Sequence, residues 1–125
     1  MQPQIKAQSA YSNSHHSTKT DKGLELDAFA NATRKLSIAL TAAQNDYPSF
    51  VSALHENRRL WIHMGAAVAD PGNQLSSELR ARIFFLAQFV DQHTAKVLGK
   101  AADPSILLEI NSGIMRGLSS GTVSQ

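Results

Sequence analysis

One helical segment sets the pattern for the whole chain: Leu54-His55-Glu56-Asn57-Arg58-Arg59-Leu60-Trp61. Apolar residues recur through this segment and beyond it at steps of three and four, the spacing of one face of an α-helix. The main face of the predicted helix carries Phe50, Leu54, Asn57, Trp61, Met64 and Val68. Polar side chains, two of them arginines, lie next to the only tryptophan of the chain. No catalytic or metal signature is built from these residues, and such a cluster is typical of a binding surface.

Three further amphipathic segments predict helices before and after this one. The expected helices run from Thr20 or Asp21 to about 44, from Pro48 to about Ala69, from Ser76 or Ser77 to about Leu98, and from Asp103-Pro104 to between Gly117 and Gly121. The apolar stripes of the other three are Leu26, Phe29, Thr33, Leu36 and Leu40; Leu79, Ile83, Leu86, Val90, His93 and Val97; and Leu107, Ile110, Ile114 and Leu118.

These segments predict an all-α fold. No run shows the sustained alternation of apolar and polar residues that marks a strand. Four amphipathic segments joined by short loops indicate a compact bundle of about four helices over residues 21–120. Residues 1–20 are rich in Gln, Ser, His and Thr and poor in large apolar side chains, so we expect a flexible N-terminal tail.

The composition fits one small domain. A chain of 125 residues with 42% hydrophobic content can bury a single core. The net charge is only +2 and the basic residues are spread along the chain, which argues against a nucleic-acid partner. The chain has no cysteine, no signal-peptide core among residues 1–23, and no apolar run of the ~20 residues that cross a bilayer. We therefore expect a cytoplasmic protein with no membrane partner.

No enzymatic constellation emerges from the sequence. The chain lacks a cysteine nucleophile, a glycine-rich phosphate loop and a nucleophile elbow. His55 and His63 are eight positions apart, about two turns of helix, which is too far for both to hold one ion. His15-His16 is expected to be a solvated pair in the tail. We expect no catalytic residue, no metal and no cofactor.

Two neighbouring phenylalanines of the third helix are expected to differ. At ~100° per residue, Phe84 lies well away from the apolar stripe, whereas Phe85 lies closer to it and is expected in the core. An exposed Phe84 would be a partner contact; the alternative is that a neighbouring helix or the N-terminal tail covers it.

Minor stripes accompany the main faces of two other helices. Val51, Arg58 and Ile62 lie beside the main face of the second helix, and Leu108 and Met115 beside that of the fourth. Either stripe could form a groove wall that accepts an amphipathic helix of another protein, or could be buried because its helix is central. Asn57 and His93 fall on core arcs, where each needs a hydrogen-bond partner.

The chain resembles the flagellar biosynthesis protein FlaF family of alphaproteobacteria. The resemblance spans about residues 20–118, and Ala10-Tyr11 is also similar to the start of the family. It rests on four stretches in order: Leu54–Trp61; Ala69-Asp70-Pro71-Gly72-Asn73; Leu79-Arg80-Ala81-Arg82-Ile83-Phe84-Phe85-Leu86-Ala87; and Ile110-Asn111-Ser112-Gly113-Ile114-Met115-Arg116-Gly117-Leu118.

The resemblance implies a role in flagellin production. Proteins of this family promote flagellin synthesis and export and act with the opposing regulator FlbT. We favour a cytoplasmic chaperone or adaptor that covers a terminal amphipathic helix of flagellin with a groove. The expected contacts are Arg58, Trp61, Ile62, Phe84, Met115 and Arg116. Trp61 is also a candidate core residue.

Two other roles are compatible with the same sequence. The chain could regulate flagellin mRNA after transcription, acting with or against FlbT, if Arg58, Arg59, Arg80 and Arg82 converged into one basic face. It could also be a structural bundle in a complex with FlbT or the export apparatus, without contacting flagellin.

Overall fold

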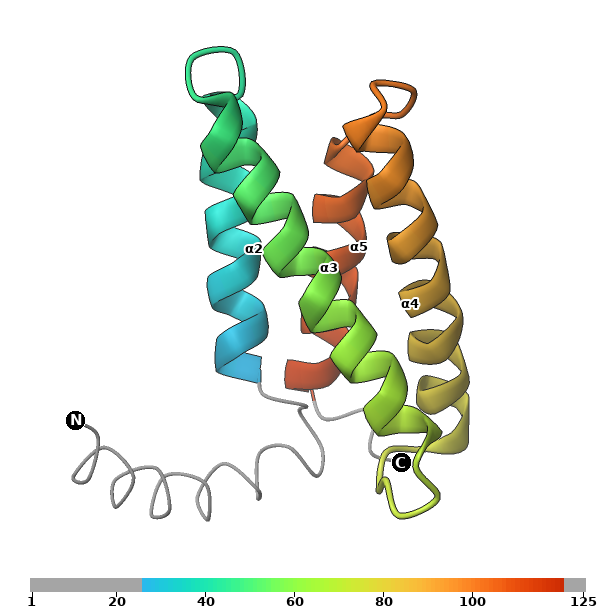
Figure 1. Cartoon of the computed structure of the whole chain (residues 1–125). Coiled ribbons are helices and arrows are strands. Elements are labelled where there is room, and N and C mark those ends of the chain that lie inside the picture. Colours follow the sequence, from blue (N-terminus) through green and yellow to red (C-terminus); the bar gives the residue numbers. More distant parts are fainter. Residues whose placement is uncertain (1–25, 121–125) are drawn as a thin grey trace, which may run out of the picture.

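The computed structural model describes residues 26–120, which form four helices and no strand (Figure 1). They are α2 (Leu26–Thr41), α3 (Tyr47–Ala69), α4 (Ser77–Leu98) and α5 (Ser105–Ser120). The all-α prediction is confirmed, and the starts of the last three helices agree with their predicted starts to within two residues. The expected tail at 1–20 and the expected start of the first helix at Thr20 or Asp21 lie outside the described residues.

The helices form an antiparallel, up-and-down bundle. Each packs against two neighbours, in the order α2, α3, α4, α5 and back to α2, and α3 makes its largest contact with α4 (Figure 1). Short connections between consecutive helices make such neighbours antiparallel. In the view of Figure 1, α3 crosses the front of the bundle and α5 lies behind it, while α2 and α4 form the two sides.

Side-chain caps start three of the helices where the sequence predicts them. The Asp46 carboxylate accepts hydrogen bonds from the backbone N–H and the hydroxyl of Ser49, at 3.2 and 2.7 Å. Ser76 caps α4 by accepting from the N–H of Leu79 at 3.2 Å. These bonds satisfy backbone donors that have no partner inside the helix.

Asp103 plays the same part just before α5. Its carboxylate accepts the backbone N–H of Ser105 at 2.9 Å. The backbone N–H and then the hydroxyl of Ser105 lower the pKa of Asp103, because both stabilise the charged form, and His93 adds a smaller attraction. The carboxylate therefore stays ionised, as a cap at a helix start requires.

The core follows the predicted faces closely. All six residues predicted for the main face of α3 are buried, and Trp61 and Phe29 have no exposed surface. Their rings meet edge to face with centroids 5.5 Å apart, a favoured aromatic geometry.

A polar network crosses the middle of this core. The Trp61 Nε1–H donates to Asn111 Oδ1 at 2.8 Å, and Asn111 Nδ2 donates to Asn57 Oδ1 at 2.7 Å and to Thr33 Oγ1 at 3.0 Å. The Thr33 hydroxyl in turn donates to the carbonyl of Phe29 at 2.7 Å. All four polar side chains are buried or nearly so, and they come from α2, α3 and α5. The predicted need of Asn57 for a buried partner is thus met by Asn111.

The indole fixes the orientation of every amide in the network. The indole N–H can only donate, so Asn111 must present its oxygen to Trp61 and its NH₂ group to the other two side chains. Asn57 must then present its own oxygen, and its Nδ2 has no hydrogen-bond partner among residues 26–120. One side chain of α5 thereby fixes the register of this helix against both α2 and α3.

Phe85 corrects one prediction. It is 65% exposed rather than in the core, and the fully buried position predicted for His93 is taken by its neighbour Thr94, while His93 is half-buried. The predicted stripe is itself buried at Leu79, Ile83, Val90 and Val97. Phe85 follows Ile83 by two residues, about 160° around the helix, so burial of Ile83 places Phe85 at the surface. The His93 Nε2 instead lies 2.8 Å from the carbonyl oxygen of Asp103 at the surface.

The end of α4 differs in detail from the predicted stop at Gly99. Gly99 keeps a negative φ of −84°, and the left-handed residue is Lys100, with φ 62°. The N–H of Ala101 bonds to the carbonyl of Lys96 at 2.8 Å, and that of Lys100 to Val97 at 2.9 Å. These two backbone hydrogen bonds together form the Schellman motif, in which glycine is the preferred left-handed residue.

Lys100→Gly should therefore be more stable than Lys100→Ala by about 1 kcal/mol, because only glycine adopts a left-handed φ without steric cost. Both variants lose the Lys100 ammonium that lies 5.6 Å from the ring centre of Tyr47, so alanine is the matched control. Chemical denaturation measures the difference, and equal stabilities would contradict the assignment.

Asn111→Leu should lower the free energy of unfolding by roughly 2–4 kcal/mol, because it leaves the Trp61 N–H and the Asn57 amide buried without partners. Ser112→Ala, a half-buried neighbour on α5, is the control and should change stability by less than about 0.5 kcal/mol. Fluorescence of Trp61, the only tryptophan, follows unfolding in denaturant. A loss of similar size in both variants would show that the network does not carry the effect.

Candidate protein-binding groove between α3 and α4

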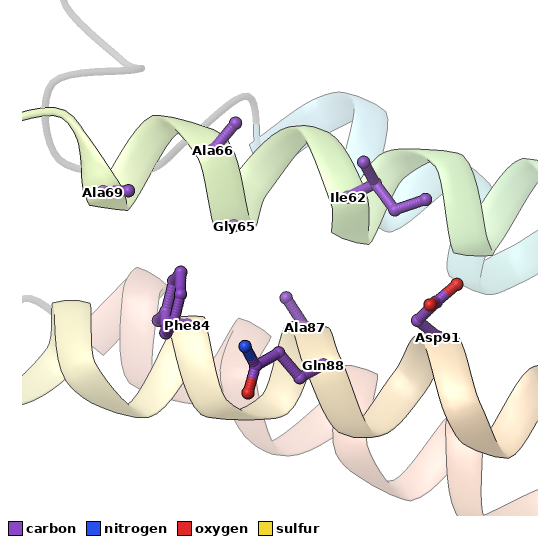
Figure 2. Close-up of a pocket in the computed structure, with 8 residues that line it drawn as sticks. All are labelled: Ile62, Gly65, Ala66, Ala69, Phe84, Ala87, Gln88 and Asp91. Carbon is purple, nitrogen blue, oxygen red and sulfur yellow. The ribbon is translucent and has the colours of Figure 1, made fainter.

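An apolar groove of about 260 Å³ runs between α3 and α4 (Figure 2). Its walls are small or apolar for most of its length, with polar groups confined to the α4 rim. It is lined by Ile62, Gly65, Ala66, Ala69, Phe84, Ala87, Gln88 and Asp91.

The groove exists because small residues face large ones across it. On α3, Gly65, Ala66 and Ala69 leave space beside the ring of Phe84, which rises from α4 toward α3 in Figure 2. The helices approach closely at its floor: a Cβ on Gly65 would lie only 2.9 Å from the Cβ of Ala87. Glycine at 65 thus sets the separation of the two helices.

Phe84 separates this groove from a second hollow on the same face. The second hollow lies toward the end of α3 and shares Ala69 and Phe84 with the first. Its remaining lining residues are Val68, Ser77, Arg80 and Ala81. A helix lying along this face would therefore meet an apolar hollow on each side of the phenylalanine ring.

Charged groups on this face are engaged within the molecule. Arg58 Nε lies 2.5 Å from Asp91 Oδ1 and joins α3 to α4 at one end of the groove. At the other end, Arg80 donates to the carbonyls of Val68 at 3.0 Å and of Asp70 at 3.1 Å. Arg80 thereby satisfies carbonyls at the C-terminus of α3 that lack helical partners.

Two large apolar side chains stay exposed at the groove. Ile62 is 51% and Phe84 is 45% exposed, and no described helix covers either of them. Of the two alternatives left open for Phe84, coverage by a neighbouring helix does not hold among residues 26–120; coverage by residues 1–25 lies outside the described residues. Clustered exposed apolar groups of this kind mark interaction surfaces more often than isolated ones do.

The structure brings together three of the six predicted contact residues. Ile62 and Phe84 line the groove, and Arg58 binds Asp91 at its end. Met115 and Arg116 belong to α5, where Met115 is half-buried against the core and Arg116 is exposed, and neither lines the groove.

Trp61 corrects the prediction that it contacts a partner. Its side chain has no exposed surface and its N–H is bound to Asn111. Its position on the main apolar face of α3, between Asn57 and Met64, already favoured the core alternative.

The four arginines considered for RNA binding do not form one basic face. Arg58 is paired with Asp91, and Arg80 binds backbone carbonyls of α3 and of the residue after it. Arg59 instead lines a hollow toward α2, together with Ala28 and Ala32. Arg82 follows Arg80 by two residues, about 160° around α4, and so lies on another side of that helix.

The small residues that shape the groove were not predicted from the sequence. A signal for them was present, because Gly65, Ala66 and Ala69 occupy one side of α3 at steps of one, three and four next to the minor stripe that ends in Ile62. These residues matter because they leave the space of the groove unfilled, and that space is defined only once α4 packs opposite them.

The described residues, 26–120, include no helix long and apolar enough to span a membrane. They also contain no group of three or more His, Asp or Glu side chains placed to hold a metal ion.

Comparison with known families identifies the chain. The family model described as "Flagellar protein FlaF" matches residues 7–118, most of the sequence. The chain belongs to the FlaF family. This membership confirms the resemblance seen in the sequence and gives the chain a flagellar role. Searches of curated proteins and of solved structures found no match.

Gly65→Ala should destabilise this FlaF-family bundle, because helix backbones hold the two Cβ atoms in place and α3 must move away from α4. Overpacking of this kind costs about 1–3 kcal/mol, against a gain of up to about 1 kcal/mol from replacing a helical glycine. We expect a net loss in denaturant unfolding.

Gly113→Ala is the matched control, since an added Cβ there would meet only the end of the Arg116 side chain, at 3.8 Å. This variant should gain stability, by up to about 1 kcal/mol. A gain in both variants would contradict the close approach at Gly65.

Proposed function

We propose that this FlaF-family chain is a cytoplasmic chaperone or adaptor that binds a terminal amphipathic helix of flagellin in the groove between α3 and α4, and so promotes flagellin synthesis and export. The observation that carries the proposal is the exposed pair Ile62 and Phe84 on either side of a hollow lined by Gly65, Ala66 and Ala69. Family membership supports the flagellar context.

The shape of the groove fits a helix. Its long axis follows α3 and α4, and hollows on both sides of Phe84 would accept apolar side chains about one turn apart. A flagellin helix that awaits export exposes an apolar face, and burial of that face against Ile62 and Phe84 would prevent early assembly.

The charges favour apolar recognition in the middle and polar contacts at the ends. Arg58 and Asp91 already neutralise one another, so binding need not strip water from an isolated charge there. Arg80 uses Nε and Nη2 for carbonyls of this chain, and its positive charge remains at the edge of the second hollow. An acidic side chain of the partner would be favoured at that end.

Phe84→Ala should weaken binding of purified flagellin by about tenfold or more, because a buried aromatic contact contributes roughly 1.5–3 kcal/mol. Calorimetric titration measures the affinity, and circular dichroism confirms that the fold is kept. Phe85→Ala is the matched control: it removes an equal ring, one residue away on the same helix, that lines neither hollow, and it should bind as the original chain does.

A second matched pair tests the α3 wall. Ile62→Asp should lose flagellin binding, whereas Ile38→Asp, which changes a 62% exposed isoleucine on α2, should retain it. No binding of full-length flagellin or of its isolated terminal helices by the original chain would refute the proposal. A salt-dependent gel shift of flagellin mRNA, or binding to FlbT alone, would then assign the flagellar role to those partners.

A further inference from the structure

The outward face of α4 carries a second surface, which the groove does not use. Five residues at alternating steps of four and three follow one line along the helix, and every one of them is exposed and uncharged. They are Ala81, Phe85, Gln88, Gln92 and Ala95, named here the α4 seam. This spacing is that of a coiled-coil contact line between two helices.

The seam points away from the core of its own chain. At ~100° per residue, Phe85 lies about 160° around α4 from the buried Ala87. In Figure 1, α4 forms one side of the bundle, and its neighbours α3 and α5 pack on its other faces. The outward face of a solvated helix is ordinarily charged. A line of five uncharged residues, which includes the most exposed phenylalanine of residues 26–120, therefore has no partner within that part of the chain.

The charges beside the seam indicate what that partner is. Glu78 and Lys96 are 18 positions apart, about five turns, so both lie on the same edge of the seam near its two ends; Arg82 is on that edge too, farther round the helix from the seam. A second copy of α4 in antiparallel orientation would place the Glu78 of each chain beside the Lys96 of the other. A parallel two-fold copy would place these charges on opposite edges of the pair, so neither would meet its opposite.

The side-chain sizes agree with the same arrangement. With the two-fold axis at Gln88, each Ala81 faces an Ala95, and each Phe85 faces a Gln92, whose smaller side chain leaves room for the ring. The two Gln88 amides meet at the axis, where each can donate to and accept from the other. Such self-complementarity is required of a two-fold interface.

We infer that two copies of this chain associate through an antiparallel pairing of their α4 seams, centred on Gln88. The two surfaces meet at Gln88, which lines the groove and lies at the axis of the pairing. Ile62 and Phe84, which carry the proposed flagellin contact, are not part of the seam, so each proposal has its own test.

Sedimentation of the full chain over a wide concentration range tests the pairing. The original chain should show a monomer–dimer equilibrium, and Phe85→Glu should be monomeric at every concentration because it places a charge in the seam. Ile38→Glu makes the same change at an equally exposed site on α2 and should dimerise as before. A monomeric original chain, or equal dimerisation of Phe85→Glu, would overturn the inference.

The absence of cysteine allows a direct test of the orientation. Under mild oxidation Gln88→Cys should form a disulfide-linked dimer, since this residue meets its own copy at the axis. Ala81→Cys alone should not, because its two copies lie about 21 Å apart along the pair, twice the rise of seven residues. A mixture of Ala81→Cys and Ala95→Cys chains should cross-link. Self-linking of Ala81→Cys, or no linking of Gln88→Cys, would overturn the antiparallel register. These readouts need no flagellin, so they fail or succeed separately from the groove.

Discussion

The bond from the Trp61 indole to Asn111 is the constraint on which the rest of the bundle depends. It brings the centre of α5 to the centre of α3. The Asn111 side-chain oxygen accepts this bond, and its NH₂ group donates to Asn57 on α3 and to Thr33 on α2. Apolar stripes alone allow helices to slide by a turn, since leucine against leucine is similar in several registers. A buried amide with directional partners is satisfied in one register only, and a slip would leave several polar groups buried without partners.

With α5 held against α2 and α3, helix α3 has a second side free to face α4. That contact is made through Gly65 and Ala87 rather than through large side chains, and so the backbones come close at one level. Close approach at the floor with small residues above it leaves a hollow at the surface. The groove is thus a consequence of the same packing that stabilises the domain. Ile62 and Phe84 stay exposed at its rim because the small residues that line it have too few side-chain atoms to cover them.

Helix α4 therefore has three different surroundings: the core, the groove shared with α3, and the outward seam. Phe84 and Phe85 are neighbours in sequence, yet about 100° of rotation places one at the groove and the other in the seam. In the two proposals, a client helix occupies the groove and a second copy of the chain occupies the seam, and Gln88 lies where the two surfaces meet.

The sequence by itself determined the all-α class, the number of helices in the described region, the starts of α3, α4 and α5 to within two residues, the buried face of α3 and the family; the end of α2 at Thr41 comes before the predicted end near 44. Each of these rests on local information: helical period, capping side chains, and a set of motifs in order. It also indicated Arg58 and Ile62 as contact residues, because they lie beside the main apolar stripe of α3, and Phe84, because it lies well away from the stripe of α4.

Only the tertiary structure decided what these residues face. The partner of Asn57 is Asn111, 54 positions away, and no local pattern pairs two amides over that distance. The close approach of α3 and α4 depends on Gly65 and Ala87, which face one another from two different helices. The separation of Met115 and Arg116 from the groove, and the different partners of Arg58 and Arg80, also depend on which helices are neighbours. A helix's period shows which residues share a face, whereas the packing of neighbouring helices determines whether that face is core, groove or solvent.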